Sequence, residues 1–169
     1  MKNIEIKAKY SDLEKGRKIA ENLNAKYVGL DHQIDTYFKT PSGRFKLRES
    51  SISGAYLVPY LRGDIPSAKL SSYVVIPVTD VSVTKNIFSL ILGIDTVVEK
   101  KRHIYLKNNV RIHLDDVVNL GTFFELEAVC DENSIIEKES QKVNELLEVF
   151  EVKKEDLLTG SYREMPISS

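Results

Sequence analysis

The stretch GRFKLRES, residues 43–50, carries a cation at every second position and a hydrophobic side chain between neighbouring cations. Successive side chains of a β-strand point to opposite faces, so Arg44, Lys46 and Arg48 would share one face. Three positive charges stacked along one strand need either water or an anion beside them. Whether this face looks outward to solvent or inward to a ligand therefore decides the fold.

The same alternation of charged and apolar residues recurs along most of the chain and indicates a largely antiparallel β protein. In SDLE, residues 11–14, Ser11 and Glu14 have the spacing of a capping box and predict that a helix starts there. Pro59 and Pro77 favour edge positions or bulges in the strands that contain them. Strands are predicted at 4–10, 32–40, 44–50, 55–63, 72–80, 97–107, 110–117 and 123–130, and helices at 11–24, 81–93 and 132–150.

Length and composition limit the class of protein. The 169 residues, of which 42% are hydrophobic, suit one globular domain that covers residues 1–169. The net charge of −1 argues against a general nucleic-acid-binding protein. No apolar run reaches the roughly 18 residues of a membrane-spanning helix, and the N-terminus lacks the apolar region of a signal peptide. With Cys130 as the one cysteine, we expect a cytoplasmic protein without internal disulfides, either a monomer or a homodimer.

Two arrangements fit the alternation: the charged face is the solvent side of an ordinary sheet, or it is the interior of a barrel. Two features favour the barrel. The helices need the apolar face and would therefore cover the outside. The charges are also sorted by sign, because RFKLR, YLR and KKR are cationic whereas FFELE is anionic. We therefore predict an α+β fold: an eight-stranded, antiparallel, closed β-barrel with a polar interior and helices packed outside.

The residues predicted to face the interior suit a polyphosphate. Closely packed cations repel one another and are costly to desolvate, so they need a polyanion among them. Carboxylates supply the oxygen ligands that Mg²⁺ and Mn²⁺ prefer, and cations beside such a metal stabilise phosphoryl charge. The cations are Lys7, Arg44, Lys46, Arg48, Arg62, Lys100, Arg102 and Arg111, and the carboxylates are Glu5, Asp115, Glu125 and Glu127.

The ordered set of motifs resembles the CYTH superfamily, also called triphosphate tunnel metalloenzymes. That superfamily contains class IV adenylyl cyclases, thiamine triphosphatases and inorganic triphosphatases. The resemblance runs over nearly the whole chain, and its strongest part is most similar to proteins named class IV adenylyl cyclases. The motifs are IEIK, HQIDTYF, GRFKLRE, KKR, VRIHLDDV followed by LGTFFELE, and the terminal GSY.

The resemblance implies a tunnel in which basic residues grip a triphosphate and acidic residues hold Mg²⁺ or Mn²⁺. It implies that the eight cations bind substrate and that Lys7, Arg62 and Arg102 act in catalysis. Glu5 and Lys7 match the second acid and the lysine of the family's N-terminal E-x-E-x-K signature. The implied metal ligands are Glu5, Asp115, Glu125 and Glu127.

One position departs from the family pattern: Asn3 stands where the signature has its first glutamate. An amide offers a neutral oxygen, so the site would carry one negative charge less and its metal affinity should fall. Two functions are therefore expected. The first is a divalent-metal-dependent enzyme that cleaves ATP, thiamine triphosphate or tripolyphosphate, either by hydrolysis or, for ATP, by cyclisation. The alternative is a non-catalytic protein that binds a triphosphate or polyphosphate.

Overall fold

Nine β-strands build one continuous sheet in the part of the chain that the structure describes. The computed structural model describes residues 2–62 and 69–165, with the backbone alone for residues 62, 69 and 70. The strands are β1 Lys2–Lys9, β2 Lys26–Phe38, β3 Arg44–Ser50, β4 Gly54–Arg62, β5 Lys69–Tyr73, β6 Ile76–Val78, β7 Ile94–Lys107, β8 Val110–Val117 and β9 Gly121–Cys130.

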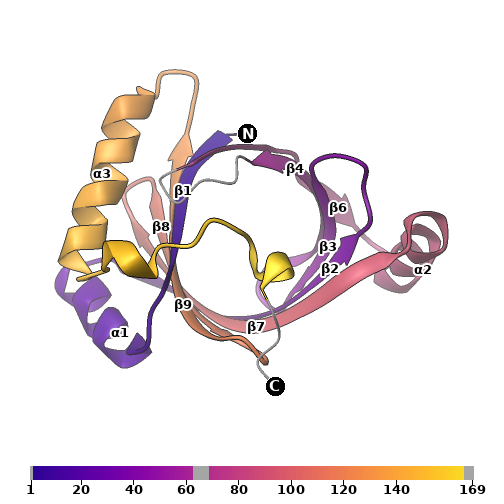
Figure 1. Ribbon diagram of the computed structural model, residues 1–169, viewed down its shortest axis with the longest axis horizontal. Helices are drawn as coiled ribbons and strands as arrows, with labels where there is room; N and C mark the ends of the chain where they lie inside the picture. Colours follow the sequence, from indigo (N-terminus) through magenta and orange to yellow (C-terminus); the bar gives the residue numbers. More distant parts are fainter. Residues whose placement is uncertain (1, 63–68, 166–169) are drawn as a thin grey trace.

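Eight of these strands close into a barrel (Figure 1). Hydrogen-bonded neighbours follow the order β3-β2-β7-β8-β9-β1-β5-β4, and β3 also pairs with β4, which closes the ring. Neighbouring strands run antiparallel throughout. The predicted eight-stranded antiparallel barrel is confirmed.

The single strand predicted at 72–80 is wrong, because two short strands, β5 and β6, lie there with Val74 and Val75 between them. β5 pairs with the C-terminal part of β4, and β6 pairs with its N-terminal part. Pro59 lies on β4 between the two paired stretches, and its carbonyl accepts a hydrogen bond from the amide of Val74 at 3.1 Å. Pro77 lies in β6, the last strand of the sheet order, which is the edge position that a proline favours.

Three helices cover the outside of the barrel. α1 (Leu13–Asn22) and α3 (Ile136–Val149) pack beside β1, β8 and β9, and α2 (Val81–Leu92) packs beside β2 (Figure 1). The predicted cap of α1 is one residue off: Asp12, not Ser11, caps the helix, and its carboxylate accepts from the amide of Lys15 at 2.9 Å. None of the described helices combines the length and the apolarity that a membrane crossing requires.

Most of the hydrophobic core lies between the barrel and the helices, and a separate buried cluster contains Tyr37, Val98 and Tyr162. Under α1 and α3, the outer faces of β1, β8 and β9 bury Ile4, Ile112, Leu114 and Leu126 against Val143, Leu147 and Phe150. Under α2, a smaller cluster contains Phe38, Leu47 and Leu57. Each such side chain contributes about 1.5–3 kcal/mol by leaving water. Because the outer faces supply this stabilisation, the inner faces of the strands are free to be polar.

The C-terminal segment runs across one mouth of the barrel. It contains two short 3₁₀ turns, η1 (Lys154–Asp156) and η2 (Tyr162–Glu164). Between them, the amide of Leu158 donates to the carbonyl of Lys7 on β1 at 2.9 Å. In Figure 1 the segment, drawn in yellow, lies within the outline of the ring of strands. It brings the ring of Tyr162 to the edge of the interior.

Candidate functional site

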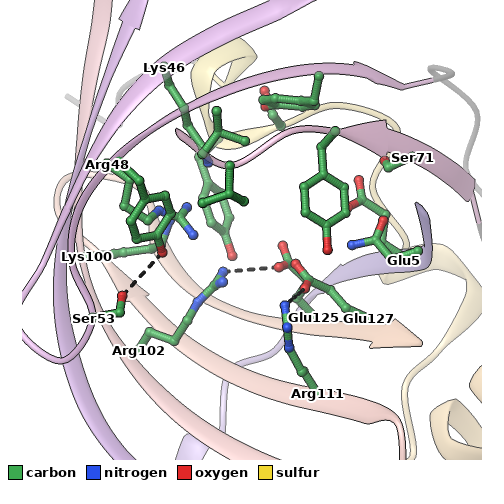
Figure 2. Close-up of a pocket in the computed structure, with 18 of the residues that line it drawn as sticks. Glu5, Lys46, Arg48, Ser53, Ser71, Lys100, Arg102, Arg111, Glu125 and Glu127 are labelled. Atoms are coloured by element: carbon green, nitrogen blue, oxygen red, sulfur yellow. Dashed lines mark hydrogen bonds and ion pairs between the residues drawn. The ribbon is translucent and has the colours of Figure 1, made fainter. Parts of the chain in front are cut away.

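The barrel holds a cavity of about 480 Å³. Alternate residues of each strand point into it, so strands far apart in sequence contribute to one surface (Figure 2). Six cations and three carboxylates line the cavity, which confirms the predicted polar interior. The cations are Lys7, Lys46, Arg48, Lys100, Arg102 and Arg111, and the carboxylates are Glu5, Glu125 and Glu127.

Three of these cations share one buried carboxylate, that of Asp35 on β2, which has no exposed surface. Arg48 binds it through two nitrogens, with Nε 2.6 Å from Oδ1 and Nη2 2.5 Å from Oδ2. The ammonium groups of Lys46 and Lys100 lie 2.9 Å and 3.2 Å from Oδ2. The sheet register explains the cluster, because Asp35 lies opposite Arg48 on β3 and within the β2–β7 pairing that carries Lys100. Asp35 therefore positions three cations against the cavity.

Burial and the charges of the cluster together shift the pKa values of its members. Burial alone would raise the pKa of Asp35, but the three cations hold it well below its usual value. Burial, with a smaller contribution from Arg48, lowers the pKa of Lys46 to about 8, although Asp35 opposes the change. Burial also holds the pKa of Lys100 well below its usual value, since Asp35 compensates only in part. A polyanion in the cavity would favour the charged form of both lysines.

A second buried network surrounds Arg102 on β7. Its Nε and Nη2 lie 2.7 Å and 2.6 Å from the two carboxylate oxygens of Asp115 on β8. The hydroxyl of Tyr162 donates to the same carboxylate at 2.6 Å. Burial tends to lower the pKa of Arg102, but Asp115 and Glu125 hold it well above its usual value. Arg102 thus stays charged, and its orientation toward the cavity is fixed from behind by Asp115.

The carboxylate of Glu125 on β9 contacts three cationic or hydrogen-bonding side chains. Its Oε2 lies 2.8 Å from the ammonium group of Lys7, and its Oε1 lies 3.2 Å from Nη2 of Arg102 and 3.1 Å from Nδ1 of His113. Burial would raise the pKa of Glu125, but Lys7 and Arg102 hold it well below its usual value. The carboxylate of Glu125 is therefore ionised, and two cations compensate its charge.

One group of side chains in the described residues has the spacing of a metal site. Ligand atoms of His113, Glu125 and Glu127 all lie within 4.8 Å of one another. Glu5 lies directly opposite Glu127 in the register of β1 and β9, and both line the cavity. Like charges directly opposite on neighbouring strands are unfavourable unless a cation lies between them. A carboxylate pair with one imidazole is a donor set that suits a divalent cation.

The structure brings most of the predicted site residues together and sets two of them, Arg44 and Asp115, apart. Arg44 is buried but lies in a separate hollow, where its guanidinium pairs with the carboxylate of Glu164 in η2. Asp115 lies behind Arg102 and does not line the cavity. The prediction for Arg62 concerns a side chain outside the described residues.

Sequence reasoning missed the part played by Asp35 and left Tyr162 undecided. Both lie in stretches quoted for the family resemblance, HQIDTYF and GSY, and Asp35 alternates with apolar Ile34 as an inward residue should. The ring of Tyr162 also lies under the ammonium group of Lys7, 3.7 Å from its centre. These two residues orient cations and do not themselves carry positive charge, so a search for cations overlooks them.

A comparison with known families agrees with the barrel and its charged interior. The CYTH domain, as a family, matches residues 1–162 of this chain. The chain belongs to the CYTH domain family. The match runs from β1 to Tyr162, and so includes all the cavity residues described above.

Individual proteins match the chain almost from end to end. A protein of Methanocaldococcus jannaschii with the name "Putative adenylate cyclase MJ0240" is 28% identical over 173 aligned positions, which cover 98% of each chain. The structure of the PH1012 protein of Pyrococcus horikoshii superposes with a TM-score of 0.85 at 25% identity and covers 99% of both chains. A conserved hypothetical protein of Pyrococcus furiosus superposes with a TM-score of 0.82 at 22% identity and covers 97% of this chain and 99% of its own.

Proposed function

We propose that this CYTH protein is a divalent-metal-dependent enzyme that binds a triphosphate in the barrel cavity and cleaves it. The observation that carries the proposal is the cavity itself: six cations face it, and a carboxylate pair with an imidazole lies in the same wall. Cations with fixed orientation stabilise phosphoryl charge without reorganising when the charge develops. A polyanion is also the ligand that the depressed lysine pKa values favour.

We assign the cavity cations to phosphate binding and to stabilising the charge that develops in the reaction. Arg48, Lys46 and Lys100, held by Asp35, bind phosphate oxygens on one wall. Arg102 and Lys7 carry positive charge on either side of Glu125 and stabilise the charge that develops as the bond breaks. The residues proposed to bind phosphate are Lys7, Lys46, Arg48, Lys100, Arg102 and Arg111.

The metal that the family implies fits this donor set. Glu125 and Glu127, with His113 beside them and Glu5 opposite, would hold Mg²⁺ or Mn²⁺. The metal would supply positive charge and Lewis acidity next to the phosphate oxygens. We assign Asp115 to positioning Arg102, because the guanidinium and the Tyr162 hydroxyl already occupy its two oxygens.

Two reactions use the same site. In hydrolysis, water attacks the terminal phosphorus, the bond to the bridging oxygen breaks, the diphosphate part leaves, and orthophosphate is formed. In cyclisation, the 3′-hydroxyl of ATP attacks the α-phosphorus and pyrophosphate leaves. The adenylate cyclase name of the M. jannaschii relative supports cyclisation as one of the two. Binding without turnover is the alternative that Asn3 favours, since an amide in the place of a carboxylate weakens a metal site.

Product analysis tests the proposal. Purified protein is incubated with ATP, thiamine triphosphate and tripolyphosphate, first with Mg²⁺ and then with Mn²⁺, and the products are resolved by chromatography. We expect orthophosphate, or cyclic AMP with pyrophosphate, and loss of product with a chelator. Glu127→Gln should abolish turnover, whereas Glu155→Gln, whose side chain is 79% exposed, should not. Tight triphosphate binding without product would contradict the enzyme and establish the receptor.

A further inference from the structure

Several buried oxygens in the cavity wall lack a hydrogen-bond partner among the described residues, and two of them lie on neighbouring strands. These two are Oδ1 of Asn3 on β1 and Oγ of Ser71 on β5. The two residues are 4% and 2% exposed, and both line the cavity. Buried polar groups in native proteins are nearly always hydrogen-bonded. Two unsatisfied oxygens at a cavity wall therefore point to a group that the ligand brings.

The two residues face each other. Asn3 and Ser71 are direct partners in the antiparallel register of β1 and β5, so their side chains lie on the same face with Cβ atoms about 5 Å apart. A hydroxyl group between them satisfies both, because it donates one hydrogen bond to the amide oxygen and accepts another from the serine hydroxyl. A phosphate oxygen only accepts, and so it would leave the amide oxygen unsatisfied.

The subsite is neutral and lies apart from the cation cluster. Figure 2 shows Ser71 and Glu5 on one side of the cavity, Arg48 and Lys100 on the other, and Glu125 and Glu127 between them. A triphosphate held by the cations would therefore reach the pair with its organic part.

We propose that Asn3 and Ser71 form a subsite that hydrogen-bonds an alcohol hydroxyl of the bound triphosphate. The subsite depends on the proposed function, since the cation cluster must hold the phosphates. It assigns the natural ligand to triphosphates with a free hydroxyl in the organic part, as nucleotides have. Tripolyphosphate has no alcohol hydroxyl, and the only alcohol oxygen of thiamine triphosphate is esterified. With either ligand bound, the two oxygens would hydrogen-bond to water instead.

The test compares ATP with 2′,3′-dideoxy-ATP by isothermal titration calorimetry in excess Mg²⁺. Wild-type protein should bind ATP about tenfold more tightly than the dideoxy nucleotide, which is the effect of one buried hydrogen bond. Ser71→Ala should weaken ATP about tenfold and leave the dideoxy nucleotide within about twofold. Ser72→Ala is the matched control, because the neighbouring serine is exposed on the outer face, and it should change neither. Asn3→Val serves as a second variant with the same expectation.

Several outcomes would overturn the subsite. If Ser71→Ala weakened the binding of both nucleotides equally, or if the wild type bound ATP no more tightly than the dideoxy nucleotide, the pair would hold water or only stabilise the barrel. Tight binding of tripolyphosphate with no binding of ATP would leave the proposed function standing and remove the hydroxyl subsite. If tripolyphosphate also fails to bind, the proposed function fails and the subsite falls with it.

Discussion

Replacement of Asp35 by Asn tests the idea that one carboxylate organises the cation cluster. The side chain keeps its size, so packing changes little, but three cations at 2.5–3.2 Å lose their common counter-ion. Each pair is worth about 4 kcal/mol at close range with an effective dielectric constant near 20, before desolvation is subtracted. Breaking a buried ion pair by removing one partner costs about 3–5 kcal/mol net. We expect Asp35→Asn to lower the free energy of unfolding by this amount at pH 7.

The size of the loss should depend on pH and on ligand. Lys46 loses its charge as the pH rises through its pKa of about 8, so its repulsion adds less to the cost and the loss should shrink at pH 9. Excess tripolyphosphate should stabilise the variant more than the wild type, because the polyanion replaces the missing carboxylate.

Urea unfolding followed by circular dichroism measures these differences, at pH 7 and pH 9, with and without tripolyphosphate. Asp116→Asn, at an exposed position on β8, is the matched control and should stay within about 0.5 kcal/mol of the wild type. A loss below about 1 kcal/mol at pH 7, against the 3–5 expected, would refute the counter-ion role. An equal loss at pH 7 and pH 9 would show that packing, not charge, is responsible.

Three further predictions concern the lysine, the tyrosine and the metal. Because the folded-state pKa of Lys46 is lowered to about 8, the unfolded chain binds more protons than the folded protein above that pH, and the stability of the empty protein should rise toward pH 10. Over the same range the affinity for tripolyphosphate should fall and its binding should take up protons, which calorimetry in two buffers would show. Unchanged affinity between pH 7 and pH 9 would contradict this. Tyr162→Phe should cost about 1 kcal/mol in urea unfolding through the lost hydrogen bond to Asp115, and an unchanged midpoint would argue against that contact. Glu127→Gln should reduce Mn²⁺ binding, followed by electron paramagnetic resonance, by at least tenfold, and wild-type Mn²⁺ affinity would remove Glu127 from the metal set.

The barrel and its polar interior could be predicted from sequence because the alternation that encodes them is local. Arg44, Lys46 and Arg48 share a face whatever the rest of the chain does, and the apolar residues between them must then meet helices. The strand at 72–80 was mispredicted because the break at Val74 and Val75 depends on how β4 divides its pairing between two partners. That division appears only when the sheet closes.

The partners inside the site could not be predicted, because they depend on register between distant strands. Nothing local to HQIDTYF shows that Asp35 meets cations from β3 and β7, and nothing local to Asn3 shows that it faces Ser71. Arg44 has the same alternation as Lys46, yet the C-terminal Glu164 draws it into a separate hollow. Sequence therefore predicts which residues point inward, and tertiary structure decides what each one meets.

Binding of tripolyphosphate tests most directly the claim that the barrel cavity is a triphosphate site. We would titrate it into wild-type protein and into Arg48→Ala at pH 7 with Mg²⁺ in excess, and follow the heat. The account predicts one site per chain in the wild type and affinity at least tenfold lower in the variant, because Arg48 is a fully charged member of the cluster. No saturable binding in the wild type, or equal binding by the variant, would contradict it.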